Sequence, residues 1–200
     1  MFRKLLLSLL APVALFALTA CSDYGQVIQG RTVAFKDEGA VKTVTFIKDS
    51  GIDDKNPHYT ELPAVNFTLP ADPAETGQLP KAGLRMKLDL EKKIITMYNP
   101  EKGAFEDLPF ELLQNDTGVN AQHPLVQNKK FPEVNAAEYT ITIFSRRQGT
   151  LSVIKLAADD FNRYKEADWD AGDEVRIYYK EMGKSLRYMN VTRTDLTKSK

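Results

Sequence analysis

The only cysteine of the 200-residue sequence, Cys21, directly follows the residues LTA, and its thiol can carry nucleophilic chemistry. A thiolate can take a lipid group, and small residues beside it let the peptide enter a processing protease. Upstream, Arg3 and Lys4 precede an apolar run over residues 5–18. This arrangement predicts a secretory signal. The run is shorter than the roughly 20 residues that a bilayer-crossing helix needs, so we do not expect a permanent anchor helix.

The stretch LTAC (residues 18–21) resembles the lipobox of bacterial lipoproteins, in which an aliphatic residue, a small residue and Ala or Gly precede a cysteine that is acylated. The resemblance implies that residues 1–20 are removed as a signal peptide and that Cys21 becomes a lipidated (palmitate-bearing) N-terminus. The alternative, an ordinary signal peptide beside a stray cysteine, would leave an unpaired thiol in an exported protein.

The lipoprotein resemblance also implies an address for the protein. Two or more acyl chains hold a protein stably on a membrane, and residues 21–25 would form a short tether. Ser22 follows the cysteine, whereas Asp at that place retains enteric lipoproteins at the inner membrane. We therefore expect the cell envelope, and the outer membrane facing the periplasm in preference to the inner membrane.

The two histidines, His58 and His123, both lie in polar loops beside prolines. Together with Asp49, Asp53 and Asp54, His58 suggests a metal site of oxygen and imidazole ligands. The stretch DSGIDDKNPH lacks the ligand order of a calcium loop, and these residue types also suit plain turns. We therefore predict no metal site and no cofactor.

Paired carboxylates are the second candidate chemistry, because two carboxyl groups flanking a cleft can act as general acid and base. The candidates are Asp159 with Asp160, and Asp168 with Asp170 and Asp173. Their places at a predicted helix start and before a predicted strand explain them without catalysis. The sequence has no Gly-x-Ser-x-Gly element for a serine nucleophile.

A cationic and aromatic strand face is the third candidate. In the strand EVRIYYK the alternation predicts that Arg176, Tyr178 and Lys180 face outward, with Arg187 on the partner strand. The predicted core residues are Val175, Ile177 and Tyr179. An outward face of Arg, Tyr and Lys can bind an anionic, glycan or protein ligand. A solvated strand face whose cations prevent edge pairing is the simpler interpretation.

Alternating apolar residues predict the strands that must position these groups. Hairpins are expected over residues 26–49 (with Gly39 at positive φ and Gly30 at a bend or bulge), 84–98, 139–156 and 171–192, with a short strand at 65–69. Along LRMKLDL one face is core, and Arg85 lies on the wet face. A short helix is expected from Ala157, and residues 104–113 suit a strand or a helical turn equally.

These elements predict a mainly β fold with one short helix, whose antiparallel hairpins form a small barrel of the OB or SH3-like kind or a sandwich. Whether they form one sheet system or two domains stays open. The expected divisions are a signal peptide at 1–20, a tether at 21–25, a β-rich region at 26–113, a long polar loop or linker at 114–138, a hairpin–helix–hairpin region at 139–193 and a disordered tail at 194–200.

The charge balance, 27 basic against 27 acidic residues, gives no global field to attract nucleic acid. Beyond the lipobox, the chain resembles mainly β lipoprotein domains of bacterial envelopes, and this likeness implies no activity. We therefore expect a non-catalytic binding or accessory module, held at the membrane by Cys21, whose partner is an envelope protein or a cell-wall component. The alternative is a carboxylate-dependent envelope hydrolase with its cleft between the loops 49–63 and 114–138.

Overall fold

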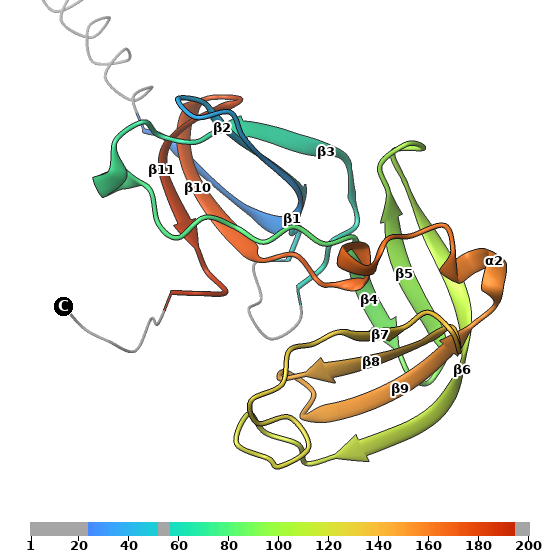
Figure 1. The fold of residues 1–200 in the computed structure, drawn as a ribbon. Coiled ribbons are helices and arrows are strands. Elements are labelled where there is room, and N and C mark those ends of the chain that lie inside the picture. Colours follow the sequence, from blue (N-terminus) through green and yellow to red (C-terminus); the bar gives the residue numbers. More distant parts are fainter. Residues whose placement is uncertain (1–23, 52–56, 195–200) are drawn as a thin grey trace, which may run out of the picture.

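A computed structural model describes residues 24–51 and 57–194 and shows a mainly β protein built from two sheets (Figure 1). Five strands close into a barrel in the order β1-β10-β11-β3-β2. They are β1 (Gln26–Asp37), β2 (Lys42–Lys48), β3 (Glu61–Thr68), β10 (Glu174–Glu181) and β11 (Lys184–Asn190). All neighbours are antiparallel except β3 and β11, which run parallel. This order and this one parallel contact are those of an OB-type barrel, so the barrel prediction is confirmed over the sandwich.

Strand β1 is the longest barrel strand and serves two neighbours. Its first half pairs with β10 and its second half with β2. Gly30 lies where the two pairings meet, since it opposes both Val175 and Lys48. A Cβ at this position would overlap the carbonyl oxygen of Ile47. The bulge itself follows two residues later, between Thr32 and Ala34. The predicted bulge is therefore not at Gly30, and a glycine stands there because the neighbouring backbone approaches closely.

The second sheet has six strands in the order β4-β5-β6-β9-β8-β7 and is inserted between β3 and β10. They are β4 (Arg85–Asp89), β5 (Ile94–Asn99), β6 (Ala104–Thr117), β7 (Glu133–Asn135), β8 (Thr140–Ser145) and β9 (Thr150–Leu156). Residues 104–113, which suited a strand or a helical turn, are thus strand. The predicted polar loop 114–138 begins inside β6 and ends beyond β7, because its residues complete ladders with β9 and β8.

Helices are short. They are η1 (Pro73–Glu75), α2 (Ala158–Phe161) and η2 (Glu166–Trp169). The helix predicted from Ala157 is α2, which Ala157 precedes as N-cap, and its Phe161 is buried. In the described part of the chain, no helix has the length and apolar character required to cross a membrane.

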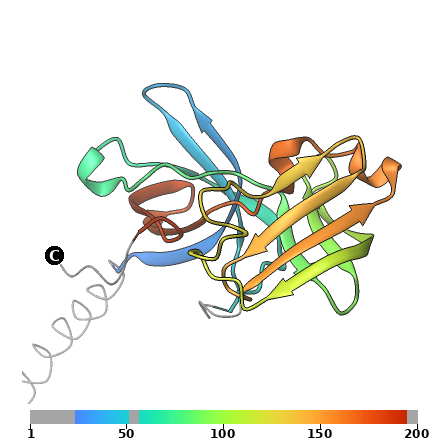
Figure 2. The same cartoon turned by 60° about the horizontal axis from the view of Figure 1, so that its bottom comes forward.

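The two sheets share a hydrophobic core. One cluster joins the barrel residues Val33 and Ile47 to residues of the second sheet and to the fully buried Trp169. A second cluster fills the barrel. Figure 2 shows the barrel and the second sheet packed against each other, with β10 returning to the barrel after β9 and α2. The chain leaves the barrel after β3 and returns to it at β10, so strands from both sides of the 114–138 segment contribute to this core.

The prediction that Arg85 lies on a solvent-exposed face of β4 is wrong. Arg85 is half-buried, and its Nε donates a hydrogen bond to the carbonyl oxygen of Trp169 at 3.0 Å. The segment before β10 covers this end of β4, since the Arg85 amide bonds the carbonyl of Asp170 at 3.1 Å. Alternation alone could not reveal a covering segment about 85 residues away in the sequence.

Candidate functional site

The outer face of the barrel across β1, β10 and β11 carries the candidate site. The register places Val27 opposite Tyr178, and Tyr178 opposite Arg187. Residues directly opposite one another in antiparallel strands share a face, so these three form one row across the sheet. The residues predicted to face the core, Val175, Ile177 and Tyr179, are buried. The predicted alternation therefore holds along β10.

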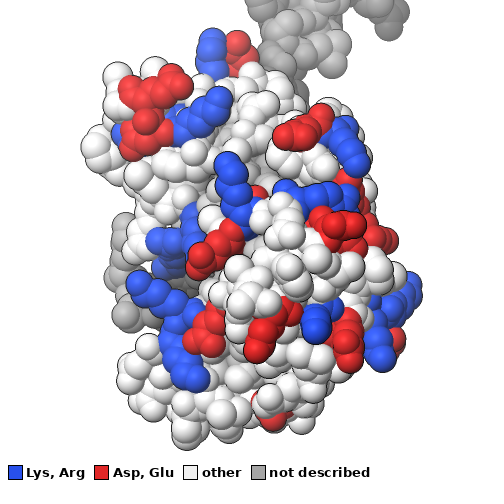
Figure 3. Space-filling view, turned by 45° about the vertical axis from the view of Figure 1, so that its right-hand side comes forward, with Lys and Arg blue, Asp and Glu red and all other residues white. Residues whose placement is uncertain are grey.

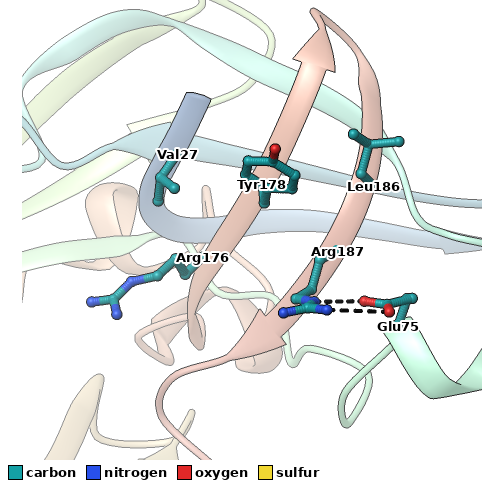
Figure 4. A pocket seen from close by; sticks show the side chains of 6 residues that line it. All are labelled: Val27, Glu75, Arg176, Tyr178, Leu186 and Arg187. Atoms are coloured by element: carbon teal, nitrogen blue, oxygen red, sulfur yellow. Dashed lines mark hydrogen bonds and ion pairs between the residues drawn. The ribbon is translucent and has the colours of Figure 1, made fainter. Parts of the chain in front are cut away.

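This face is hollowed into an open pocket of about 560 Å³. Its lining residues are Val27, Glu75, Arg176, Tyr178, Leu186 and Arg187. Figure 4 shows that Val27, Tyr178 and Leu186 line one side and that Arg176, Arg187 and Glu75 line the other. The pocket is thus amphipathic, with an apolar and aromatic wall beside a charged wall.

Arg187 and Glu75 form the charged pair of this pocket. Arg187 Nε lies 2.6 Å from Glu75 Oε2, and Nη2 lies 3.2 Å from Oε1. The hydrogen bond from Arg187 lowers the pKa of the Glu75 carboxyl, and Glu75 in turn raises the pKa of Arg187. Both side chains reach solvent, so the pair is screened and weak in free energy.

A segment between β3 and β4 brings Glu75 to the barrel. Asp72 caps η1 by accepting a hydrogen bond from the Ala74 amide at 2.8 Å. Beyond η1, Thr76 forms a parallel bridge with Tyr188 of β11, and the Gly77 amide donates to the Tyr188 carbonyl at 3.1 Å. This backbone pairing fixes Glu75 beside Arg187.

Arg176 is fixed at the other end of the charged wall. Its Nε donates to Gln29 Oε1 at 2.7 Å, and the Gln29 amide nitrogen donates to the carboxylate of Glu174. Gln29 and Glu174 are both buried. The chain of bonds orients the guanidinium. Within the described residues Arg176 has no ion pair with a carboxylate, so it suits recognition of an anionic group.

Tyr178 separates the two arginines and packs on Gly25. A Cβ at Gly25 would overlap the Tyr178 ring, so the absence of a side chain there makes room for the ring. The ring therefore offers a flat surface for stacking or apolar contact. Lys180, the fourth predicted residue, is exposed on the same strand two positions further on and is not among the lining residues.

Three lining residues were missed by sequence reasoning. Val27 and Leu186 are exposed apolar residues, and Glu75 comes from a loop that the sequence marks only as Pro-rich. The signal for Val27 is alternation along β1, which places it outside while Ile28 is buried. Nothing in the sequence pairs Glu75 with Arg187, 112 residues away.

The histidines and their neighbouring carboxylate have structural roles. Asp49 Oδ1 accepts hydrogen bonds from the amides of Gly51 and His58 at 3.0 and 2.8 Å, which closes the loop. The His123 ring accepts from the Leu125 amide at 3.3 Å. Asp53 and Asp54, like Cys21, lie outside the described residues. Within residues 24–51 and 57–194, no group of three potential metal ligands converges.

Asp159 is exposed in the first turn of α2, and bonds to other residues hold the other four candidate catalytic carboxylates. Asp160 pairs with Arg163, Asp170 with Lys81, and Asp168 accepts from the Lys165 amide. Asp173 is buried and contacts Asn190, Arg193 and the Lys81 amide. These bonds explain the four carboxylates as supports of turns and strand ends. None of the four lines the pocket at Arg176, Tyr178 and Arg187.

Charges elsewhere on the surface are mixed. Figure 3 shows Lys and Arg beside Asp and Glu over most of one face, without a broad area of a single sign. The candidate pocket therefore differs from that surface by its two arginines beside an aromatic and apolar wall.

Fold and site together define a mainly β protein whose OB-type barrel carries an amphipathic pocket on its outer face. The chain belongs to the family described as Domain of unknown function (DUF4881), which matches residues 23–199. No curated protein matches the chain. No solved structure matches it either.

Proposed function

We propose that the protein is a lipid-anchored component of the cell envelope that acts as a non-catalytic binding or accessory module. The observation that carries this proposal is the amphipathic pocket on the β1-β10-β11 face, where Arg176, Tyr178 and Arg187 converge. Three of the four residues that the sequence marked for binding line one pocket, although they lie on two different strands.

The proposed anchor is the acylated thiol of Cys21. Support comes from the lipobox-like stretch LTAC and from the signal-like segment before it. A lipidated N-terminus would place the barrel at a membrane surface, and Ser22 favours the outer membrane facing the periplasm. Incorporation of a palmitate analogue into the wild-type chain, lost on Cys21→Ala, is the expected result.

The proposed partner is an envelope protein or a cell-wall component that presents an anionic group next to an apolar group. The anionic group would meet the guanidinium of Arg176 or Arg187, which favour carboxylate and phosphate. The apolar part would lie on Tyr178, Val27 and Leu186. A non-catalytic role agrees with the structural bonds of the candidate carboxylates.

The test is co-purification from gently solubilised envelopes. The wild-type chain should retain a stoichiometric partner, and the double variant Arg176→Ala/Arg187→Ala should lose at least about nine-tenths of it. The matched control is Arg146→Ala, because Arg146 is equally cationic and exposed in the β8–β9 turn of the second sheet. A chain that comes out alone, or a partner that the double variant retains as the wild type does, contradicts the proposal.

A further inference from the structure

Large apolar side chains are exposed at one end of the barrel. Tyr24, just before β1, is 87% exposed, Val41 in the β1–β2 turn is 48% exposed, and Met182 in the β10–β11 turn is 62% exposed. We name this end, defined by Tyr24, Val41 and Met182, the apolar end. Single exposed apolar residues are ordinary, but three on adjacent chain segments need a reason.

Backbone bonds establish that these segments lie at the same end. The Leu69 amide donates to the Lys42 carbonyl, and the Thr68 amide donates to the Gly183 carbonyl, both at 2.8 Å. The end of β3 therefore joins the β1–β2 turn to the β10–β11 turn. Gln26 pairs with Tyr179, which brings the start of β1 to the same end. Both turns and the start of β1 lie at the top of the barrel in Figure 1, and Figure 2 shows that the β1–β2 turn and the start of β1 are separated from each other across this end.

The proposed lipid lies close to this end. Three residue steps separate Cys21 from Tyr24, and an extended chain spans at most ~3.5 Å per residue, so the lipidated residue is within about 10 Å of Tyr24. The second sheet lies at the opposite side of the molecule in Figure 1. An anchor at Cys21 thus presents the apolar end, and not the second sheet, to the membrane.

We propose that the apolar end rests on the membrane surface, with Tyr24, Val41 and Met182 entering the headgroup region. The inference relies on the lipid anchor of the proposed function. Tyrosine is favoured at membrane–water interfaces, and valine and methionine gain free energy on leaving water. The anchor keeps the local lipid concentration high, so weak individual contacts are enough to hold the orientation.

Charge contributes little to this contact. The two turns and the residues next to them hold Lys36, Lys42, Lys180 and Lys184 against Asp37, Glu38 and Glu181. Lys184 pairs with Glu181 at 2.9 Å, and Lys42 lies 3.6 Å from Asp37. Because the signs nearly balance, the orientation should change little with salt, unlike a contact made by a polybasic surface.

The experiment uses the single cysteine of the chain. Acylation occupies the Cys21 thiol, so Met182→Cys or Val41→Cys supplies the one thiol open to labelling in the lipidated full chain. The control is Leu113→Cys, because Leu113 is 49% exposed on β6 of the second sheet. Each protein carries an environment-sensitive fluorophore and is reconstituted into phosphatidylethanolamine and phosphatidylglycerol vesicles with nitroxide-labelled headgroups.

The expected result is quenching by the nitroxide lipid at least threefold stronger at positions 182 and 41 than at position 113, at both low and high salt. Equal quenching at all three positions overturns the inference. A second outcome also overturns the inference: the labels at 182 and 41 are shielded in detergent by a co-purified protein and are not quenched in vesicles. This outcome would assign the apolar end to a protein contact.

Flotation of the vesicles separates the two proposals. Protein that floats while its labels are quenched equally keeps the lipid anchor and overturns the orientation. Protein that fails to float overturns the anchor, and the orientation with it. Circular dichroism of each labelled variant verifies that the fold is retained.

Discussion

In the pocket, the carboxylate of Glu75 accepts two hydrogen bonds from the Arg187 guanidinium, with N–O distances of 2.6 and 3.2 Å. An anionic partner would have to compete with it. We predict that Glu75→Gln strengthens partner binding, because a neutral amide holds a guanidinium less firmly than a carboxylate does. Since the pair is exposed, the gain is about fivefold at most. The measurement is the Kd of the co-purified partner, by surface plasmon resonance.

One control variant completes this test of Glu75. Glu91→Gln is the matched control, since Glu91 is exposed in the turn before β5 of the second sheet and does not line the pocket. It should leave the Kd unchanged. Weaker binding by Glu75→Gln would contradict the prediction and assign Glu75 a direct contact with the partner.

The candidate pocket could be predicted from the sequence only in part. The alternation of β10 identifies Arg176 and Tyr178 as outward, since successive strand residues point to opposite faces. It cannot identify the neighbouring strand, so Val27, nearly 150 residues earlier, was not foreseen. Leu186 lies at a register shift in β11, where Tyr179 opposes Ser185 and Tyr178 opposes Arg187, and a bulge of this kind has no sequence signature.

Among the elements, the local hairpins were predictable and the long-range pairings were not. Turn residues with positive φ, such as Gly149 and Gly183, mark the hairpins β8–β9 and β10–β11. The pairing of β1 with β10 and the insertion of a whole sheet between β3 and β10 depend on packing of distant segments. The end of β6 was not predicted, because residues 114–117 are polar and show no apolar alternation. They are polar because this part of the strand is largely exposed.

The link between β6 and the segment after α2 depends on Glu106. Its Oε1 lies 2.6 Å from Lys102 Nζ, and its Oε2 accepts a hydrogen bond from the Tyr164 hydroxyl at 2.8 Å. Hydrogen bonds from Lys102 first and Tyr164 second lower the pKa of Glu106 to about 2. A carboxyl whose pKa falls on folding stabilises the fold above its unfolded pKa, and this contribution is lost as the pH falls through the folded value.

We predict that Glu106→Gln lowers the free energy of unfolding by about 1 kcal/mol at pH 7. The difference from wild type should shrink between about pH 4.5 and pH 2, because wild-type Glu106 then becomes protonated. Urea unfolding followed by circular dichroism at pH 7, 5, 3 and 2 measures it. Glu111→Gln, at an exposed position of the same strand, is the control. A constant difference down to pH 2 would show that the carboxylate charge is not responsible.

At the scale of the whole molecule, Arg31 joins the barrel to the second sheet. From β1, its Nη1 donates to the carbonyls of Met86 and Arg85 in β4 at 2.7 and 3.3 Å. Its guanidinium also lies over the Tyr59 ring, 4.1 Å from the centroid. Burial lowers the pKa of Arg31 and raises that of Tyr59 to about 12. A guanidinium at this junction is costly to bury, so its bonds to β4 must compensate.

Because the sheets share Arg31 and a core that includes Trp169, we predict that they unfold in one transition. Two probes report on the two hydrophobic clusters, in a Cys21→Ala chain. Fluorescence of Trp169, the only tryptophan, reports on the cluster that includes the second sheet, and thiol protection of Val44→Cys reports on the cluster inside the barrel. Their urea midpoints should coincide. Arg31→Met should lower both midpoints together, by about 2 kcal/mol in free energy of unfolding, since the variant leaves the β4 carbonyls without their donor.

The control for Arg31→Met is Arg146→Met, which removes an equally long cationic side chain from an exposed turn and should shift the midpoints by less than about 0.5 kcal/mol. If the two wild-type midpoints separate, the barrel and the second sheet are independent units, and a shared core is not what holds them. If Arg31→Met is as stable as wild type, burial of the charge costs as much as its bonds return, and the apolar contacts between the sheets alone make the molecule cooperative.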